Sequence, residues 1–98
     1  MASEIVVFRL QPTITQADFL KAVDETTDLL KTQHGFISRN VSLTDSGEWL
    51  DILSWESIED AKAAVTIFQT EPAGKHFSEY MDPHQIQVFY AKTVVEFP

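Results

Sequence analysis

A chain of 98 residues supports a single hydrophobic core, so residues 1–98 are taken as one domain. Its composition, 44% hydrophobic with seven Phe and two Trp, excludes a disordered chain, and the lack of cysteine excludes disulfides, thiolate metal sites and a cysteine nucleophile. The net charge of −8, with only seven scattered Lys and Arg, opposes binding to nucleic acid or to an anionic membrane surface.

The opening segment MASEIVVFRLQP has one short apolar run with an acidic residue beside it. This pattern matches neither a signal peptide nor a membrane span. We therefore expect a cytoplasmic protein that is not embedded in a membrane.

The first third of the chain predicts a strand and a helix. Residues 3–10 are rich in β-branched and aromatic side chains and are followed by Pro12, as is typical of a short strand. Residues 15–31 follow the helical period and begin with a capping-box-like pair, Thr15 and Asp18. The acidic residues on the helix could suggest a cation site, but no loop gathers their carboxylates, so we interpret them as a solvated face. These residues are Asp24, Glu25 and Asp28.

The middle of the chain predicts a β-hairpin. Gly35 suits the left-handed residue that ends a helix, and residues 36–44 then alternate between apolar and polar side chains. Residues 45–48 carry Gly47 and predict a tight turn, and residues 48–55 form the returning strand.

The last part of the chain predicts a helix, a short helical turn and a long strand. Ser57 is a suitable N-cap, and four apolar residues follow it at helical spacing. These are Ala61, Ala64, Val65 and Phe68. Pro72 and Gly74 interrupt this helix, residues 75–81 allow a short helical turn, and residues 85–97 predict the final strand.

The resulting order, βαββαβ, is that of an α+β, ferredoxin-like fold, in which two helices cover one face of a four-stranded antiparallel sheet. The first and last strands are apolar on both faces, so the uncovered face of the sheet also needs burial. A second copy packed sheet to sheet is the simplest solution, and we expect a homodimer, with TVVEF near the C-terminus able to extend the sheet of the neighbouring copy.

The segment HGFISRNVSLTDSGEWLDILSWESIEDAKAA, followed by AGKHF, resembles the antibiotic biosynthesis monooxygenase-like domains of the dimeric α+β barrel superfamily. The resemblance lies in the order of Gly35-Phe36, the polar hairpin, Trp55, Ser57 and the Ala-rich helix. It implies a small cavity between sheet and helices, and activities that include cofactor-independent oxygenation of quinol-like molecules and haem degradation.

The haem-degrading branch of this family uses an Asn on the first strand, a Trp on the second helix and a His on the short helical segment. Phe8 stands at the strand position here, the helix position lies near Ala64, and only His76 could match. We therefore exclude haem degradation and expect no cofactor. His34, His76 and His84 also lack metal-ligand spacing, so we expect no metal.

Oxygenation without a cofactor needs an apolar cavity with a few polar groups that favour deprotonation of the substrate and stabilise negative charge. Our candidate catalytic residues are His76, Asn40 and Tyr80; Arg39 and His34 are weaker candidates. His76 and Tyr80 are four residues apart and share a helical face, which points either into the cavity or to solvent. Asn40 lies on the polar face of its strand, which either lines the cavity or is solvated. The candidate substrate-binding residues are Tyr90, Phe77 and Phe68.

The two tryptophans receive structural interpretations. Trp55 is expected to seat the second helix on the sheet, and Trp49 to lie at an edge or in the dimer contact. The leading functional hypothesis is a cofactor-independent monooxygenase acting on a small aromatic or quinol-like molecule. The alternative is a non-catalytic dimeric domain, a binding or stress-associated one, that holds a small apolar ligand in the same cavity.

Overall fold

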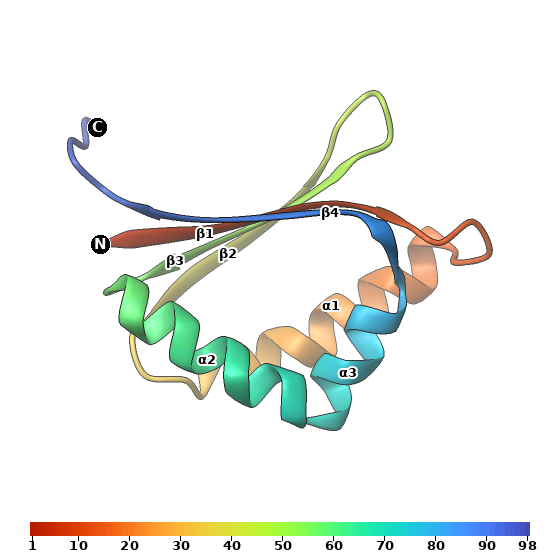
Figure 1. Cartoon of the computed structure of the whole chain (residues 1–98), viewed down its shortest axis with the longest axis horizontal. Coiled ribbons are helices and arrows are strands. Elements are labelled where there is room, and N and C mark those ends of the chain that lie inside the picture. The colour runs from red at the N-terminus through yellow and green to blue at the C-terminus, as the bar shows by residue number, and fades with distance from the viewer.

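The computed structural model describes all residues, 1–98. Three helices lie on one side of a twisted sheet, and the other side of the sheet is left open (Figure 1). The elements are β1 (Ala2–Leu10), α1 (Gln16–Lys31), β2 (Phe36–Leu43), β3 (Trp49–Trp55), α2 (Ile58–Thr70), α3 (Pro72–Glu79) and β4 (Met81–Lys92).

The sheet has the strand order β2-β3-β1-β4, and every neighbouring pair is antiparallel. This is the predicted ferredoxin-like arrangement, with α3 as the short helical insertion before the last strand. None of the three helices has the length and apolar character that crossing a membrane requires.

The predicted helix caps and the two predicted left-handed glycines are present in the structure. The Thr15 hydroxyl accepts a hydrogen bond from the Asp18 N–H at 3.1 Å, and the Ser57 hydroxyl accepts one from the Asp60 N–H at 3.0 Å, so both long helices are capped at their first turn. Gly35 and Gly47 have φ of 82° and 89°, in the left-handed region that favours glycine. These residues fix where the helices and the hairpin begin and end.

The second helix ends at Thr70, before Pro72, as predicted. The third helix starts earlier than the predicted residues 75–81, because Pro72 opens it. Gly74 packs directly against the backbone of Phe68, where a Cβ would collide with the carbonyl group. This close approach brings α3 against the end of α2 and places the rings of Phe68 and Phe77 edge to face at 5.8 Å.

The prediction for the last strand was wrong at both ends. Pairing begins at Met81 opposite Leu10, and a register shift accommodates Pro83, which an edge strand tolerates because its N–H side faces away from the sheet. Pairing stops at Lys92, because its partner on β1 is Ala2 and only Thr93 still bonds to the Met1 carbonyl. Residues 93–98 then leave the sheet as an extended tail (Figure 1).

The helix-facing side of the sheet carries two groups of packed side chains. One group contains Phe8, Phe19, Ala22, Trp49, Phe77 and Met81; the other contains Leu30, Leu53, Trp55, Ala61 and Ala64. Trp55 is fully buried against the alanines of α2, which confirms its predicted seating role. Trp49 was assigned wrongly to an edge or dimer contact: it is buried in the core, with its ring 4.8 Å from that of Phe19.

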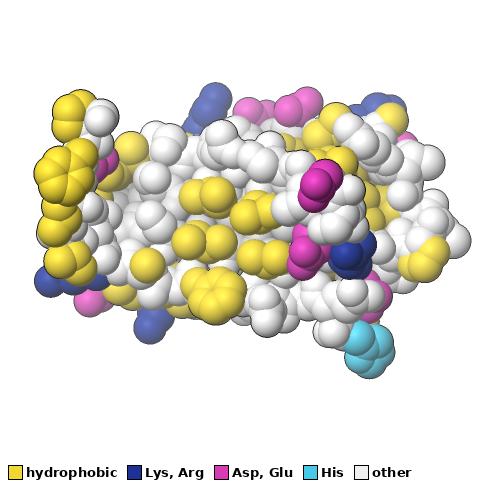
Figure 2. All heavy atoms as spheres, turned by 90° about the horizontal axis from the view of Figure 1, so that it is seen from above, with side chains coloured by type: hydrophobic (Ala, Val, Ile, Leu, Met, Phe, Trp, Pro, Cys, Tyr) yellow, Lys and Arg dark blue, Asp and Glu magenta, His cyan; other side chains and the backbone are white.

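The opposite side of the sheet is apolar at its centre (Figure 2). Ile5 lies between Ile52 and Phe89 on the neighbouring strands, and Val7 lies beside Leu50. These five residues alternate with the helix-facing ones along each strand. We call them the outer patch; no helix of the chain covers it.

Candidate functional site

A cavity of about 250 Å³ lies between the sheet and the helices α2 and α3. Residues of both core groups line it, together with residues of β4. Ile86 and Val88 of β4 line it, yet 39% and 48% of their surfaces remain exposed, because no helix covers this edge strand. The cavity therefore reaches solvent along β4.

Aromatic and aliphatic side chains form most of the cavity wall. The three predicted substrate-binding residues, Tyr90, Phe77 and Phe68, all line it, together with Trp55. The other apolar lining residues are Val6, Leu30, Leu53, Ala64, Val65, Met81, Ile86 and Val88. Such walls suit a small ligand that is itself largely apolar or aromatic.

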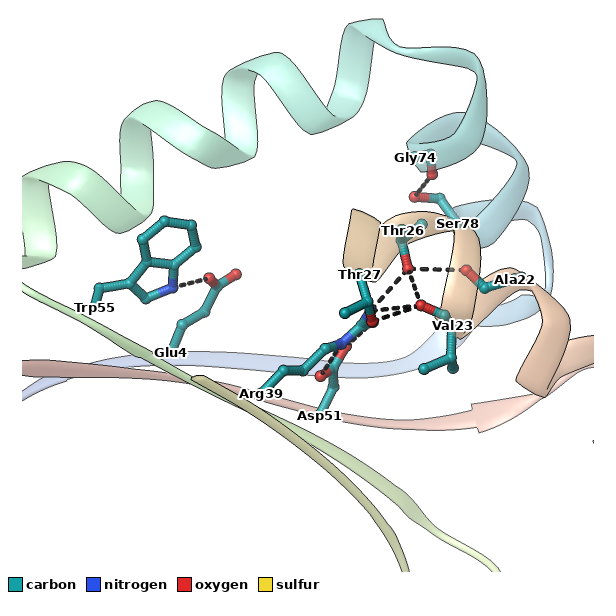
Figure 3. Close-up of polar contacts among 10 residues, drawn as sticks. All are labelled: Glu4, Ala22, Val23, Thr26, Thr27, Arg39, Asp51, Trp55, Gly74 and Ser78. Atoms are coloured by element: carbon teal, nitrogen blue, oxygen red, sulfur yellow. Dashed lines mark hydrogen bonds and ion pairs between the residues drawn. The ribbon is translucent and has the colours of Figure 1, made fainter. Parts of the chain in front are cut away.

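The polar part of the cavity is its floor, where Glu4 of β1 lies 7% exposed. The indole N–H of Trp55 donates a hydrogen bond to Glu4 Oε1 at 3.1 Å (Figure 3). Glu4 Oε2 accepts no hydrogen bond from the protein. Every fully buried side-chain oxygen in the protein has a hydrogen-bond partner, so Oε2 is not fully buried. Oε2 therefore faces the cavity that Glu4 lines.

Burial raises the pKa of the Glu4 carboxyl from 4.5 to about 7. The Trp55 hydrogen bond and the charge of Arg39 lower the pKa, whereas the charge of Asp51 raises it, and removal from water outweighs all three. A carboxyl group with a pKa near neutrality can both accept and return a proton at physiological pH.

Beside Glu4, Arg39 and Asp51 form a buried ion pair. Arg39 Nε donates to Asp51 Oδ1 at 2.9 Å and Nη2 donates to Oδ2 at 2.7 Å, a bidentate arrangement. Nη1 donates to the Thr26 and Thr27 hydroxyls and to the Val23 carbonyl of α1, at 2.8, 2.9 and 3.0 Å (Figure 3). Every guanidinium nitrogen thus has a protein partner, so Arg39 joins α1 to the sheet and is not available as an anchor for an anion.

Tyr90 faces Glu4 directly across the β1–β4 pair. Burial, and then the charge of Glu4, raise the pKa of the Tyr90 phenol, so Tyr90 stays neutral at physiological pH. The Lys62 ammonium lies 5.5 Å from the centre of the Tyr90 ring. Tyr90 offers the cavity a neutral aromatic wall with a hydroxyl group.

The three predicted catalytic residues do not line this cavity. His76 and Tyr80 do share a helical face, and Tyr80 Oη lies 2.8 Å from His76 Nε2, but His76 is exposed to solvent. Asn40 lies on the open side of the sheet beside Ile52, and its amide oxygen accepts a hydrogen bond from the Ser42 hydroxyl. This placement does not support a catalytic role for them in the cavity.

Glu4 and Asp51 were not among the residues predicted from the sequence, and Arg39 was only a weaker candidate. A signal was available: Glu4 shares a strand face with Val6 and Phe8, and Asp51 shares one with Leu53 and both tryptophans. A charged residue on the apolar face of a strand is buried, and a buried charge needs a partner or a function.

One group of potential metal ligands lies elsewhere. His34, Glu56 and Asp60 have donor atoms within 4.8 Å of one another, and His34 Nε2 lies 3.9 Å from Asp60 Oδ1. His34 and Glu56 are solvent-exposed, and none of the three lines the cavity. Exposed groups of this kind are common on protein surfaces, and nothing else in the structure indicates a ligand there.

Comparison with known proteins adds information on the fold. No protein-family model and no curated protein matches the sequence. Among solved structures, a mutant of SnoaB, a cofactor-independent oxygenase from Streptomyces nogalater, matches with a TM-score of 0.81 and 12% identity over 99% of this chain and 96% of its own.

Two further structures match over nearly their whole length. A proposed antibiotic biosynthesis monooxygenase from Bordetella bronchiseptica gives a TM-score of 0.78 and 19% identity over 96% and 97% of the two chains. A dimeric ferredoxin-like protein from an uncultured marine organism gives 0.72 and 16% over 99% and 90%. The chain therefore has the fold of antibiotic biosynthesis monooxygenase-like proteins, as the resemblance in its sequence predicted. At these identities the comparison establishes the fold and not the activity.

Proposed function

We propose that the protein is a small monooxygenase that needs no bound cofactor and that oxidises an aromatic, quinol-like molecule. The observation that carries the proposal is the cavity, which combines aromatic walls with one carboxyl group, Glu4, that no basic side chain pairs with. Its volume of about 250 Å³ lies just below the usual range for ligand sites, about 300–1,000 Å³. This size suits a ligand of one or two rings.

In this class of reaction the substrate is its own reductant. An activated CH₂ group flanked by aromatic or carbonyl groups reacts with O₂ to give a carbonyl group and water, and the substrate loses the four electrons that O₂ gains. The protein must hold the substrate away from water and favour loss of its proton. The apolar wall meets the first requirement, and a polar group at the floor meets the second.

The fold supports this proposal by analogy, since a structure of the same fold is described as that of a cofactor-independent oxygenase. Tyr90, Phe77 and Phe68 are the residues that we propose to contact the substrate. All three line the cavity together with Trp55 and Glu4, and the rings of Phe68 and Phe77 are in contact.

We also propose that the outer patch joins two copies of the chain into a homodimer. Ile5, Val7, Leu50, Ile52 and Phe89 form an apolar surface at the centre of the open sheet face, a pattern that monomeric proteins seldom leave in water. A second copy presents the same patch, so two sheets can bury it face to face. The neighbour described as a dimeric ferredoxin-like protein agrees with this proposal.

Oxygen uptake tests the activity. Chelator-treated protein is mixed with hydroquinones, naphthols and anthrones, with heat-denatured protein as control. We expect O₂ consumption above the control with at least one compound and a carbonyl product formed in equal amount. Uptake that disappears after chelation and returns with a metal ion would contradict a metal-free reaction.

The alternative is a domain that binds a small apolar ligand without changing it, and the same cavity would serve that role. Saturable binding of the aromatic compounds with no oxygen uptake and no product would favour this alternative over the monooxygenase.

A further inference from the structure

We propose that Glu4 is the proton acceptor of the cavity and that the ligand is a neutral hydroxyaromatic molecule, a phenol or an enol, whose O–H group lies against Glu4 Oε2. The inference deepens the proposed function and rests on it for the location of the site. It adds a proton acceptor, Glu4, that neither the fold nor the sequence pattern assigns.

The two carboxyl oxygens of Glu4 differ in their hydrogen bonding. Oε1 is held by the indole N–H of Trp55 at 3.1 Å, and Trp55 is itself fully buried and cannot turn away. Oε2 has no protein donor and faces the cavity. Oε1 is thus held in place, and Oε2 is free to accept a hydrogen bond from a ligand.

The groups around Glu4 leave its charge without a partner. Asp51 of β3 and Arg39 of β2 are paired with each other, and Tyr90 of β4 faces Glu4 as a neutral phenol. The polar lining residues of α2 and α3, Gln69 and Ser78, carry no charge, and the Lys62 ammonium of α2 lies over the Tyr90 ring without forming an ion pair with Glu4. The raised pKa of the Glu4 carboxyl, about 7, agrees with this environment and suits a general base working near neutrality.

These charges also select the ligand. An aryl carboxylate would bring a negative charge next to Glu4 and Asp51, and Arg39 has no free nitrogen to compensate it. An ammonium ion would pair with Glu4, but only after the loss of its own hydration in an apolar cavity. A neutral hydroxyl group donates to Oε2 without either cost. We therefore assign the cavity to neutral O–H donors.

The proton transfer is balanced within the site. The O–H bond of the ligand breaks, the proton binds to Glu4 Oε2, and the electron pair stays on the ligand oxygen as a phenolate or enolate. The total charge of the occupied cavity does not change, so the step needs no further charge from solvent. The electron-rich anion formed is the species that can react with oxygen under the proposed function.

Three matched probes test the proposal without oxygen: 4-nitrophenol, 4-nitroanisole and 4-nitrobenzoate, which differ in bearing a hydroxyl, a methoxy or a carboxylate group. Affinities are measured anaerobically by calorimetry, and the visible phenolate band of bound 4-nitrophenol reports its ionisation. With wild-type protein, we expect 4-nitrophenol to bind about tenfold more tightly than either other probe, which reflects one hydrogen bond to a charged group. We also expect the bound probe to be partly ionised near pH 7, where a large fraction of Glu4 is in the carboxylate form that can take its proton.

Glu4→Gln keeps an acceptor for Trp55 but cannot take a proton. Bound 4-nitrophenol should therefore stay mostly neutral in this variant near pH 7, because the apolar cavity disfavours a phenolate whose proton has gone to solvent, whereas the matched surface variant Glu25→Gln should behave as the wild type. Near-ultraviolet circular dichroism checks that Glu4→Gln is folded. If that variant does not fold, the comparison of the three probes on wild-type protein decides by itself.

Equal affinities for the hydroxyl and methoxy probes, or an unchanged phenolate band in folded Glu4→Gln, would overturn the proposal. Failure of the monooxygenase proposal gives a different result: the phenolate band appears and depends on Glu4, but no compound causes oxygen uptake. The two failures are therefore distinguishable.

Discussion

The indole N–H of Trp55 donates a hydrogen bond of 3.1 Å to Glu4 across the β1–β3 pair. This contact links the residue on which α2 packs to the acidic residue at the floor of the cavity. Trp55 packs under the alanines of α2 and at the same time holds the only unpaired acidic group of the cavity. One side chain thus serves both packing and the electrostatics of the site.

Replacing Trp55 should change the titration of Glu4. The Trp55 hydrogen bond lowers the pKa of the Glu4 carboxyl, so Trp55→Phe, which keeps an aromatic ring but removes the donor, should raise that pKa above about 7. The smaller ring should also reduce the free energy of unfolding by about 1–3 kcal/mol. Carbon-13 NMR titration of the glutamate carboxyls and urea unfolding measure the two effects. A pKa of Glu4 that is unchanged or lower would contradict a hydrogen bond from Trp55 to the ionised carboxyl group.

The raised pKa of Glu4 predicts how stability depends on pH. The carboxyl titrates near 4.5 when unfolded and near 7 when folded, so between these values the folded protein holds a proton that the unfolded chain has lost. This contribution of Glu4 is fully present below pH 4.5 and is lost as the pH rises through 7, by at most about 3 kcal/mol.

Glu4→Gln is always neutral and should remove this contribution. Urea unfolding at pH 5 and pH 8 should show the variant gaining stability relative to wild type at the higher pH, with Glu25→Gln as the control. A wild type whose stability relative to Glu4→Gln is the same at both pH values would show that Glu4 has an ordinary pKa.

The sequence was sufficient to predict the fold because its local signals agree with one another. The caps at Thr15 and Ser57 and the left-handed glycines at 35 and 47 mark element ends by backbone chemistry that needs no distant contact. The final strand was placed wrongly because its limits depend on its partner: it stops where β1 has no further residues to pair with. Long-range pairing of this kind is not encoded in the strand itself.

The site was only partly predictable. Aromatic residues near the end of an amphipathic helix and on the last strand suggested a cavity wall, and Phe68, Phe77 and Tyr90 do line it. The polar floor was missed because Glu4 and Asp51 come from different strands, and their meeting depends on the β1–β3 register. His76 was chosen for its chemistry alone, and chemistry does not say on which side of α3 it lies.

The buried ion pair should be essential for stability. Arg39→Met leaves Asp51 buried without its partner and removes the contacts to α1, and we expect a loss of about 3–5 kcal/mol in the free energy of unfolding. Arg39→Lys should recover only part of it, since an ammonium group cannot make the bidentate contact. The double variant Arg39→Met with Asp51→Leu should be more stable than Arg39→Met alone. Urea unfolding of the three variants at pH 7 measures this; a double variant that is the least stable would contradict the buried-charge explanation.

A direct comparison separates the two assignments of the proton acceptor. His76 was the candidate from the sequence, whereas Glu4 is the group at the floor of the cavity. Once an oxidised substrate is found, Glu4→Gln should reduce kcat/KM by about 100-fold or more, the usual contribution of a general base. His76→Ala should leave kcat/KM within about twofold of wild type, because the imidazole is exposed, does not line the cavity and hydrogen-bonds to Tyr80. The reverse result would restore His76 as the base.

The outer patch gives the last prediction. Ile52 lies at its centre, between Ile5 and Asn40 on the neighbouring strands, so Ile52→Glu should place a charge in the proposed contact between two copies. The buried charges would repel each other across the two-fold axis, and light scattering after size-exclusion chromatography should show the mass falling from dimer to monomer. Ile67→Glu is the matched control, since Ile67 is an exposed isoleucine on the helical side, away from the patch, and its change should leave the dimer intact. A wild-type protein that runs as a monomer across the micromolar range, or dimers lost equally in both variants, would contradict the sheet-to-sheet arrangement.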